Sequence, residues 1–168
     1  MILVYTGNGK GKTSACVGQA LRARGQGKRV VFGQFFKHPG QAGEQRELSS
    51  LLGDDFRAQG PGFCLGERDD INKHKEAARE MLAWAEEKLP GSFMLVLDEA
   101  IYALSAGILD EVELKAIIAL CREKDVHLVL SGRGAPVWLL EEAEMVSEIN
   151  EIKHHMQSGQ KARAGIEF

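Results

Sequence analysis

The stretch Thr6-Gly7-Asn8-Gly9-Lys10-Gly11-Lys12-Thr13 decides how the rest of this chain is interpreted. The apolar run Ile2-Leu3-Val4-Tyr5 precedes it, and a helical pattern from Ser14 to Arg24 follows it. A strand, a glycine-rich turn, a Lys-Thr pair and a helix, in this order, are typical of a phosphate-binding loop, the P-loop. We therefore expect the phosphate groups of a nucleotide to bind here.

The residue types in this loop suit phosphate for separate reasons. Its glycines let successive backbone N–H groups curl around phosphate oxygens, and the following helix adds free N–H groups and partial positive charge. We expect Lys12 to reach the terminal phosphates and the Thr13 hydroxyl to hold Mg²⁺. The common pattern G-x-x-x-x-G-K-[ST] requires a first glycine where this chain has Thr6, so the loop is a variant of that motif.

Composition and charge limit the class of protein. The chain has 168 residues, which suits one domain over residues 1–168, and it is 44% hydrophobic and 27% charged, as ordinary globular proteins are. The net charge of −3 gives no electrostatic footprint for nucleic acid, and no apolar run is long enough for a membrane span. We therefore expect neither nucleic acid nor a membrane as a partner. Three cysteines without a C-x-x-C pair, and no signal peptide, favour a reduced, cytoplasmic protein.

Strands and helices alternate along the chain. Apolar runs predict strands at 28–36, 93–97 and 126–131, and weaker patterns predict strands at 56–58 and 145–152. Helices are expected near Glu44, over 70–89, after Asp110 with Glu113 in a capping box, and after Pro136. The apolar face expected for helix 70–89 consists of Ile71, Ala78, Met81, Leu82, Ala85 and Leu89. This alternation predicts an α/β fold, a mostly parallel β-sheet with helices on both faces, of the RecA-like nucleotide-binding type.

Three groups of polar residues follow predicted strands, at the sheet edge where α/β proteins bind ligands. They are the phosphate loop, the acidic pair Asp98-Glu99, and the turn Gly132-Arg133-Gly134. A carboxylate at the end of an apolar strand can complete the shell of Mg²⁺, and spacing alone leaves open which of the two acids does so. The Arg133 guanidinium can grip a phosphate with two hydrogen bonds. Lys37 is either a further phosphate contact or a loop cation.

Several motifs, in order along the whole chain, resemble the P-loop type of ATP:corrinoid adenosyltransferase. They are TGNGKGKT at 6–13, QFFK at 34–37, Gly62-Phe63, Leu97-Asp98-Glu99, GRGAP at 132–136, and the closing residues 153–168. The variant loop and the GRGAP turn are the specific ones. The resemblance implies an enzyme that transfers the 5′-deoxyadenosyl group of ATP to the Co(I) centre of a reduced corrinoid. Triphosphate would be released, and adenosylcobalamin or an adenosylated precursor formed.

The resemblance also implies roles for particular residues. It makes Lys12, Thr13 and Glu99 the catalytic residues and places Mg²⁺, or Mn²⁺, on Thr13 and Glu99, with Asp98 beside them. Because cobalt is the nucleophile, the protein needs no general base; it must align the ribose C5′ and stabilise charge on the leaving triphosphate. Binding of the nucleotide and the corrinoid is assigned to Gly7, Asn8, Gly9, Lys10, Gly11, Lys12, Thr13, Ser14, Arg133, Phe63 and Leu65.

The corrinoid contact is where this chain departs from the family pattern. After Gly62-Phe63 the family carries Thr-Trp, and this chain has Cys64-Leu65. We expect Leu65 to exclude water from the corrin face with less apolar area than a Trp provides. The resemblance further implies a homodimer and a flavodoxin-like reductase as electron donor. It leaves open whether the acceptor is cobalamin, cobinamide or cobyrinic acid a,c-diamide.

Two alternatives remain from the residues alone. A P-loop ATPase or kinase would release phosphate or transfer a phosphoryl group without a corrinoid. A non-catalytic protein would bind a corrinoid or a nucleotide without turnover.

Overall fold

A computed structural model describes residues 1–62 and 71–167. In this part of the chain one six-stranded sheet has the order β3-β2-β4-β5-β1-β6, and each neighbouring pair is parallel. The strands are β1 (Ile2–Thr6), β2 (Val30–Phe35), β3 (Phe56–Gln59), β4 (Met94–Asp98), β5 (His127–Ser131) and β6 (Met145–Glu148). The expected α/β fold with a parallel sheet is confirmed.

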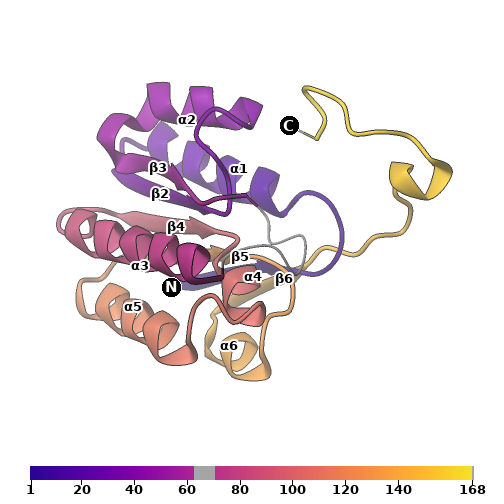
Figure 1. Cartoon of the computed structure of the whole chain (residues 1–168). Helices are drawn as coiled ribbons and strands as arrows, with labels where there is room; N and C mark the ends of the chain where they lie inside the picture. Colours follow the sequence, from indigo (N-terminus) through magenta and orange to yellow (C-terminus); the bar gives the residue numbers. More distant parts are fainter. Residues whose placement is uncertain (63–70, 168) are drawn as a thin grey trace.

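Helices cover both faces of this sheet (Figure 1). The helices α1 (Lys12–Gly25) and α2 (Gly43–Leu52) pack on one face. The other face is covered by α3 (Ile71–Lys88), α4 (Ala100–Ser105), α5 (Glu111–Glu123) and α6 (Val137–Glu142). Two short 3-10 helices, Gly53–Asp55 and His155–Ser158, complete the described elements.

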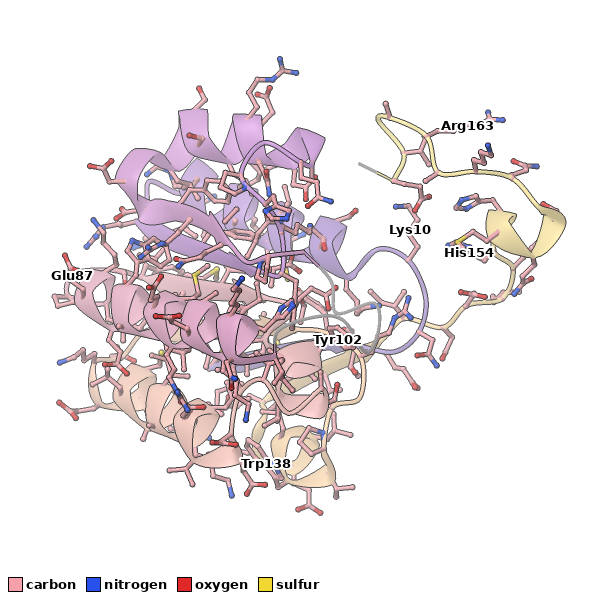
Figure 2. All side chains as sticks on the ribbon, in the orientation of Figure 1. Lys10, Glu87, Tyr102, Trp138, His154 and Arg163 are labelled. Carbon is pink, nitrogen blue, oxygen red and sulfur yellow. The ribbon has the colours of Figure 1, made fainter. Side chains whose placement is uncertain are left out.

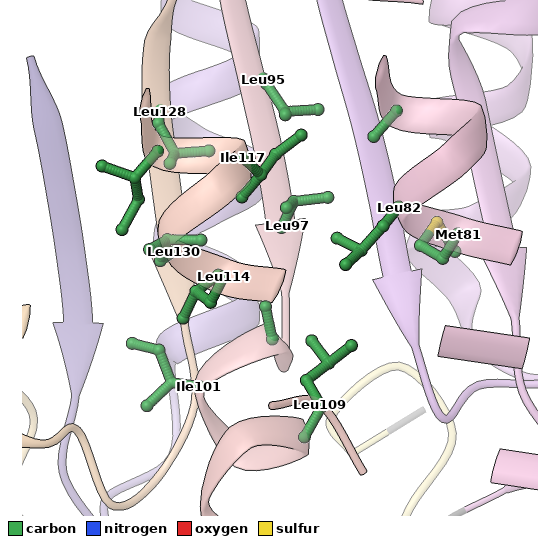
Figure 3. Close-up of a cluster of buried hydrophobic side chains, with 14 of the residues drawn as sticks. Met81, Leu82, Leu95, Leu97, Ile101, Leu109, Leu114, Ile117, Leu128 and Leu130 are labelled. Carbon is green, nitrogen blue, oxygen red and sulfur yellow. The ribbon is translucent and has the colours of Figure 1, made fainter. Parts of the chain in front are cut away.

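Each strand contributes to two hydrophobic cores, because successive side chains of a strand point to opposite faces. In β4, Met94 and Val96 pack under α1, while Leu95 and Leu97 pack on the other side. Figure 3 shows Leu95 and Leu97 among leucines and isoleucines of neighbouring strands and helices. Burial on both faces explains why the central strands are almost continuously apolar in sequence.

The helix over residues 70–89 has a different apolar face from the one expected. Ala78, Met81, Leu82, Ala85 and Leu89 are buried, as expected. Ile71, however, is 49% exposed at the first position of α3. His74, one turn further on, is buried instead and packs against Phe36, with the ring centroids 5.9 Å apart. The expectation for Ile71 was therefore wrong, since the helix reaches the core only from its second turn.

Two further boundaries differ from expectation. The strand expected over 145–152 ends at Glu148. The carbonyl of the next residue, Ile149, accepts a hydrogen bond from the Gly9 amide at 2.7 Å, so the chain there runs alongside the phosphate loop. The short helix α4, which directly follows the acidic pair, was not expected. The capping box of α5 is confirmed, with Asp110 and Glu113 making both reciprocal contacts.

The buried cysteines behave as apolar core residues. Cys16 and Cys121 are free and buried, and Cys64 lies outside the described residues. Among the helices that the structure describes, none combines the length and the apolar character needed to cross a bilayer.

The strand order brings the polar groups together. Strand β5 lies between β1 and β4, so the carboxyl ends of these three strands are neighbours. Tyr5 pairs with Ser131, and Gln34 of β2 pairs with Asp98. The phosphate loop, the acidic pair and the Gly-Arg-Gly turn therefore leave the sheet at the same edge.

Candidate functional site

The phosphate loop is shaped by its glycines and by the chain that follows β6. Gly7 and Gly11 have φ angles of 96° and 123°, a region that side chains disfavour. A Cβ atom on Gly9 would lie 2.7 Å from the Ile149 oxygen, so the neighbouring backbone requires a glycine here too. Thr6 is the last residue of β1 and pairs with Glu148, so an extended strand residue replaces the usual first glycine.

Lys12 is folded onto its own loop. Its Nζ donates hydrogen bonds to the carbonyl oxygens of Gly7 and Gly9, at 2.9 and 2.8 Å. Burial lowers the pKa of the Lys12 ammonium from its ordinary value, against the opposing effect of Glu99. A cation held in a desolvated position is attracted strongly by an incoming polyphosphate.

Asp98 is fully buried and is the acceptor for several donors at the edge of the sheet. Thr13 Oγ1 donates to its Oδ2 at 3.0 Å, Ser131 Oγ donates to its Oδ1 at 2.6 Å, and Gln34 Nε2 donates at 3.1 Å. Lys37 Nζ lies 3.5 Å from the same carboxylate. Asp98 therefore orients Thr13, and through Ser131 it joins the ends of β4 and β5.

Glu99, the next residue, differs from Asp98 in the surroundings of its carboxylate. It adopts a left-handed φ of 65° as the N-cap of α4, held by a hydrogen bond from its amide to Ser131 Oγ at 2.9 Å. No hydrogen bond from the described residues reaches its carboxylate, which lines a cavity. Burial, and then the neighbouring charge of Asp98, raise the pKa of the Glu99 carboxyl. A divalent cation beside it would relieve both penalties.

Lys37 is a half-buried cation between two carboxylates. Its Nζ lies 2.8 Å from Glu44 Oε1 as well as 3.5 Å from Asp98. Burial alone would lower the pKa of Lys37, but Asp98 and Glu44 more than offset this and raise it. In this structure Lys37 therefore balances the charge of the acidic groups.

A cavity of about 1060 Å³ opens above these groups. One part of its wall is charged, with Lys10, Lys12, Glu99 and Arg133, and another part is apolar. The apolar part combines α1 with the C-terminal segment and consists of Val17, Leu21, Met156 and Ile166. The cavity is thus suited to a molecule with a polyanionic end and an aromatic or aliphatic end.

Most of the site residues expected from sequence meet at this cavity. Asn8, Gly9, Lys10, Gly11, Lys12, Thr13, Ser14, Glu99 and Arg133 line it. Gly7 lies behind the wall and contributes its carbonyl to Lys12. Asp98 is covered by its hydrogen-bond partners, so it supports the wall rather than forming it. Phe63 and Leu65 lie outside the described residues.

Several contributors were not expected from sequence. Gln34 could have been identified from sequence, because it is a polar residue within an apolar strand, and it is buried. Glu44 has no such sequence signal, because acidic residues are common in the first turn of a helix such as α2. The C-terminal segment also reaches the site: Lys10 lies 3.4 Å from Glu167, and Figure 2 shows Lys10 extending from the loop toward the segment that carries His154. Such long-range contacts leave no local pattern.

Comparisons with known proteins agree on one family. The family model described as ATP:corrinoid adenosyltransferase BtuR/CobO/CobP matches residues 1–168. Corrinoid adenosyltransferase CobA of Salmonella typhimurium is 35% identical over all of this chain and 85% of its own length. The corrinoid adenosyltransferase of Escherichia coli K12 is 36% identical, with the same coverage.

Solved structures give a weaker likeness. AMPPCP-bound DnaA from Aquifex aeolicus aligns with 88% of this chain and 39% of its own, at 15% identity and a TM-score of 0.46.

Proposed function

The chain belongs to the ATP:corrinoid adenosyltransferase family, and from that premise we propose how it acts on its two substrates. The 5′-deoxyadenosyl group of ATP passes to the Co(I) centre of a reduced corrinoid. A cobalt–carbon bond forms at the ribose C5′, the C5′–oxygen bond breaks, and the electron pair of that bond leaves with triphosphate. The observation that carries this proposal is the convergence of the phosphate loop, Glu99 and Arg133 on one cavity that also has an apolar wall.

The loop and its cations hold the triphosphate as a leaving group. Residues 8–11 and the start of α1 at Lys12 line the cavity that the phosphates would enter, and the N–H groups at the start of α1 are available to phosphate oxygens, whereas the Gly9 amide is bonded to Ile149. Lys12 then exchanges its two carbonyl partners for phosphate oxygens, and Lys10 and Arg133 add charge from the sides. These groups stabilise negative charge that grows on the leaving oxygen, which is the main electrostatic task in this reaction.

We propose Mg²⁺, with Mn²⁺ as a substitute, as the metal of this site. The residues fit it: Thr13 offers a hydroxyl oriented by Asp98, and Glu99 offers a carboxylate without a hydrogen bond from the described residues. Both are the hard oxygen ligands that Mg²⁺ prefers. When bound, the ion neutralises charge on the triphosphate. Glu99 and Thr13 would hold it, and Asp98 keeps Thr13 in place.

The corrinoid side of the site remains a proposal from the family resemblance. We assign Phe63 and Leu65 to the corrin face, with cobalamin, cobinamide or cobyrinic acid a,c-diamide as acceptor. A flavodoxin-like reductase would supply the electron that produces Co(I), and the enzyme would work as a cytoplasmic homodimer.

The test is a spectrophotometric assay with ATP, Mg²⁺ and chemically reduced cobalamin. We expect the absorbance of a cobalt–carbon product and one triphosphate released per product. Lys12→Ala should abolish this turnover and weaken ATP binding, because it removes the loop's central cation. Phosphate release without corrinoid would instead indicate an ATPase or kinase, and binding of both substrates without product would indicate a carrier; either result overturns the proposal.

A further inference from the structure

A cluster of side chains that could bind a metal lies in the C-terminal segment, apart from Thr13 and Glu99, which we propose as the magnesium ligands. His154, His155 and Glu167 each offer one ligand atom, and these atoms all lie within 4.8 Å of one another. All three side chains are half-buried. Residues at the two ends of this segment therefore meet in space.

The distances suit a shared ion better than a direct hydrogen bond. His155 Nδ1 is 3.7 Å from Glu167 Oε1, which is too long for a hydrogen bond. Two ligand atoms on one tetrahedral zinc ion are about 3.3 Å apart, given zinc–ligand distances near 2 Å. Only a small movement would bring this pair into ligand positions.

The two histidines are also available. His155 Nε2 is buried without a hydrogen-bond partner among the described residues. His154 Nδ1 accepts only a long contact of 3.4 Å from the Met156 amide. The two rings lie 4.4 Å apart between centroids and are tilted by 36°, and one nitrogen of each is among the ligand atoms that lie within 4.8 Å of one another. Neither ring is committed to a strong interaction that a metal would have to break.

We propose that His154, His155 and Glu167 bind one divalent transition-metal ion of the Zn²⁺ class, and that this ion fixes residues 153–167 beside the phosphate loop. Two imidazoles and one carboxylate suit zinc, cobalt, nickel or copper, whereas magnesium and calcium prefer oxygen ligands. Three protein ligands leave a fourth position for water or another ligand.

The second oxygen of Glu167 links the ion to the phosphate loop. Lys10 Nζ lies 3.4 Å from Glu167 Oε2, so this contact can persist while Oε1 binds the metal. His154, Met156 and Glu167 also line the nucleotide cavity. A metal at this cluster would therefore hold one wall of that cavity in place, independently of ATP and corrinoid.

The binding test uses the metal-free full-length protein and zinc chloride, titrated calorimetrically with excess Mg²⁺ to occupy oxygen-only sites. We expect one zinc per chain. His155→Ala and Glu167→Gln should each weaken binding at least about tenfold. The matched controls His38→Ala and Glu151→Gln, which change an exposed histidine and an exposed glutamate just before the segment, should bind zinc as the unmodified protein does. Absence of zinc binding, or equal affinity in all variants, overturns the site.

Limited proteolysis tests the second half of the proposal. Lys153, Lys161 and Arg163 are exposed trypsin sites within the segment. Zinc should slow cleavage at these sites in the unmodified protein and leave the Glu167→Gln rate unchanged. Zinc binding without slower cleavage would show that the ion does not fix the segment.

Discussion

Asp98 and Glu99 are adjacent residues with different tasks. Asp98 ends a buried strand and accepts hydrogen bonds from Thr13, Ser131 and Gln34, so it organises the protein. Glu99 occupies a left-handed N-cap that turns its carboxylate toward the cavity. The backbone change from strand to helix separates the two side chains. Sequence spacing could not decide between them for this reason, and the family resemblance favoured Glu99.

This difference predicts how the metal requirement changes in two variants. Glu99→Gln removes the charge of the cavity-facing carboxylate that we propose as a metal ligand, so the Mg²⁺ concentration for half-maximal rate should rise at least about tenfold. Asp98→Asn should raise it less, but should lower the free energy of unfolding by about 2 kcal/mol, because it weakens hydrogen bonds to a buried charge. Metal titrations and urea unfolding measure the two effects. The reverse order in the metal titrations would exchange the two roles.

The raised pKa of Glu99 also predicts a pH-dependent stability. The folded state binds the Glu99 proton more tightly than the unfolded state does, so its contribution to stability is present at acidic pH and lost as pH rises through the raised pKa. Glu99→Gln should therefore be more stable than the unmodified protein at neutral pH. The difference should shrink as pH falls toward the ordinary glutamate value of 4.5.

Thermal unfolding without metal, over a series of pH values, measures this effect. Added Mg²⁺ should then stabilise the unmodified protein more than Glu99→Gln, because binding to the folded state alone shifts the equilibrium. A difference between the two proteins that does not change with pH would show that the buried charge is not the cause.

At the scale of elements, the alternation of strands and helices follows from local sequence. Continuous apolar runs mark β2, β4 and β5 because both faces of these strands are buried. Sequence could also place the phosphate loop, since strand, glycines and helix are contiguous. It could not give the roles of Ser131 and Gln34, which depend on the order of strands in the sheet. That order is set by long-range packing rather than by neighbours in the chain.

The phosphate loop illustrates how one element constrains another. Gly9 donates its amide to Ile149 and leaves no space for a side chain, because a Cβ would also lie 2.8 Å from the Asn150 backbone. The loop is therefore held by the chain that follows β6. The weak sequence pattern of the exposed edge strand β6 did not suggest that the chain after it would support the phosphate loop.

Gly9→Ala should lower the free energy of unfolding by about 1–3 kcal/mol, because the added methyl group must displace the backbone of Ile149 and Asn150. It should also weaken ATP binding, since the loop must shift. Gly18→Ala is the matched control: it lies within α1 with open space around its Cβ, and should stabilise by about 0.5–1 kcal/mol. Urea unfolding compares the two, and an unchanged stability of Gly9→Ala would contradict the packing described here.

At the scale of the whole molecule, the described part of the C-terminal segment lies outside the hydrophobic cores. It leaves the sheet after β6 and extends beside the cavity (Figure 1). None of its described residues, up to Glu167, belongs to either hydrophobic core, and most are exposed. Its described attachments include the ion pair of Lys10 with Glu167. Stability and substrate binding should therefore separate in this segment.

Deletion of residues 153–168 tests that separation. The urea midpoint should change little, because none of the described residues in the deleted segment belongs to a hydrophobic core. The dissociation constant for ATP should rise about tenfold, a loss of about 1.4 kcal/mol. The reason is that Met156, Ile166 and Glu167 form part of the cavity wall. Calorimetric titration with a non-hydrolysable ATP analogue measures the change.

Point variants keep that test decisive if the shortened chain does not fold. Met156→Ser with Ile166→Ser removes the apolar part of the segment's wall and leaves the chain length unchanged, so ATP binding should again weaken. Ile152→Ser is the control, because Ile152 is 98% exposed and does not line the cavity. If the double variant binds ATP as well as Ile152→Ser does, the segment is not a wall of the nucleotide site.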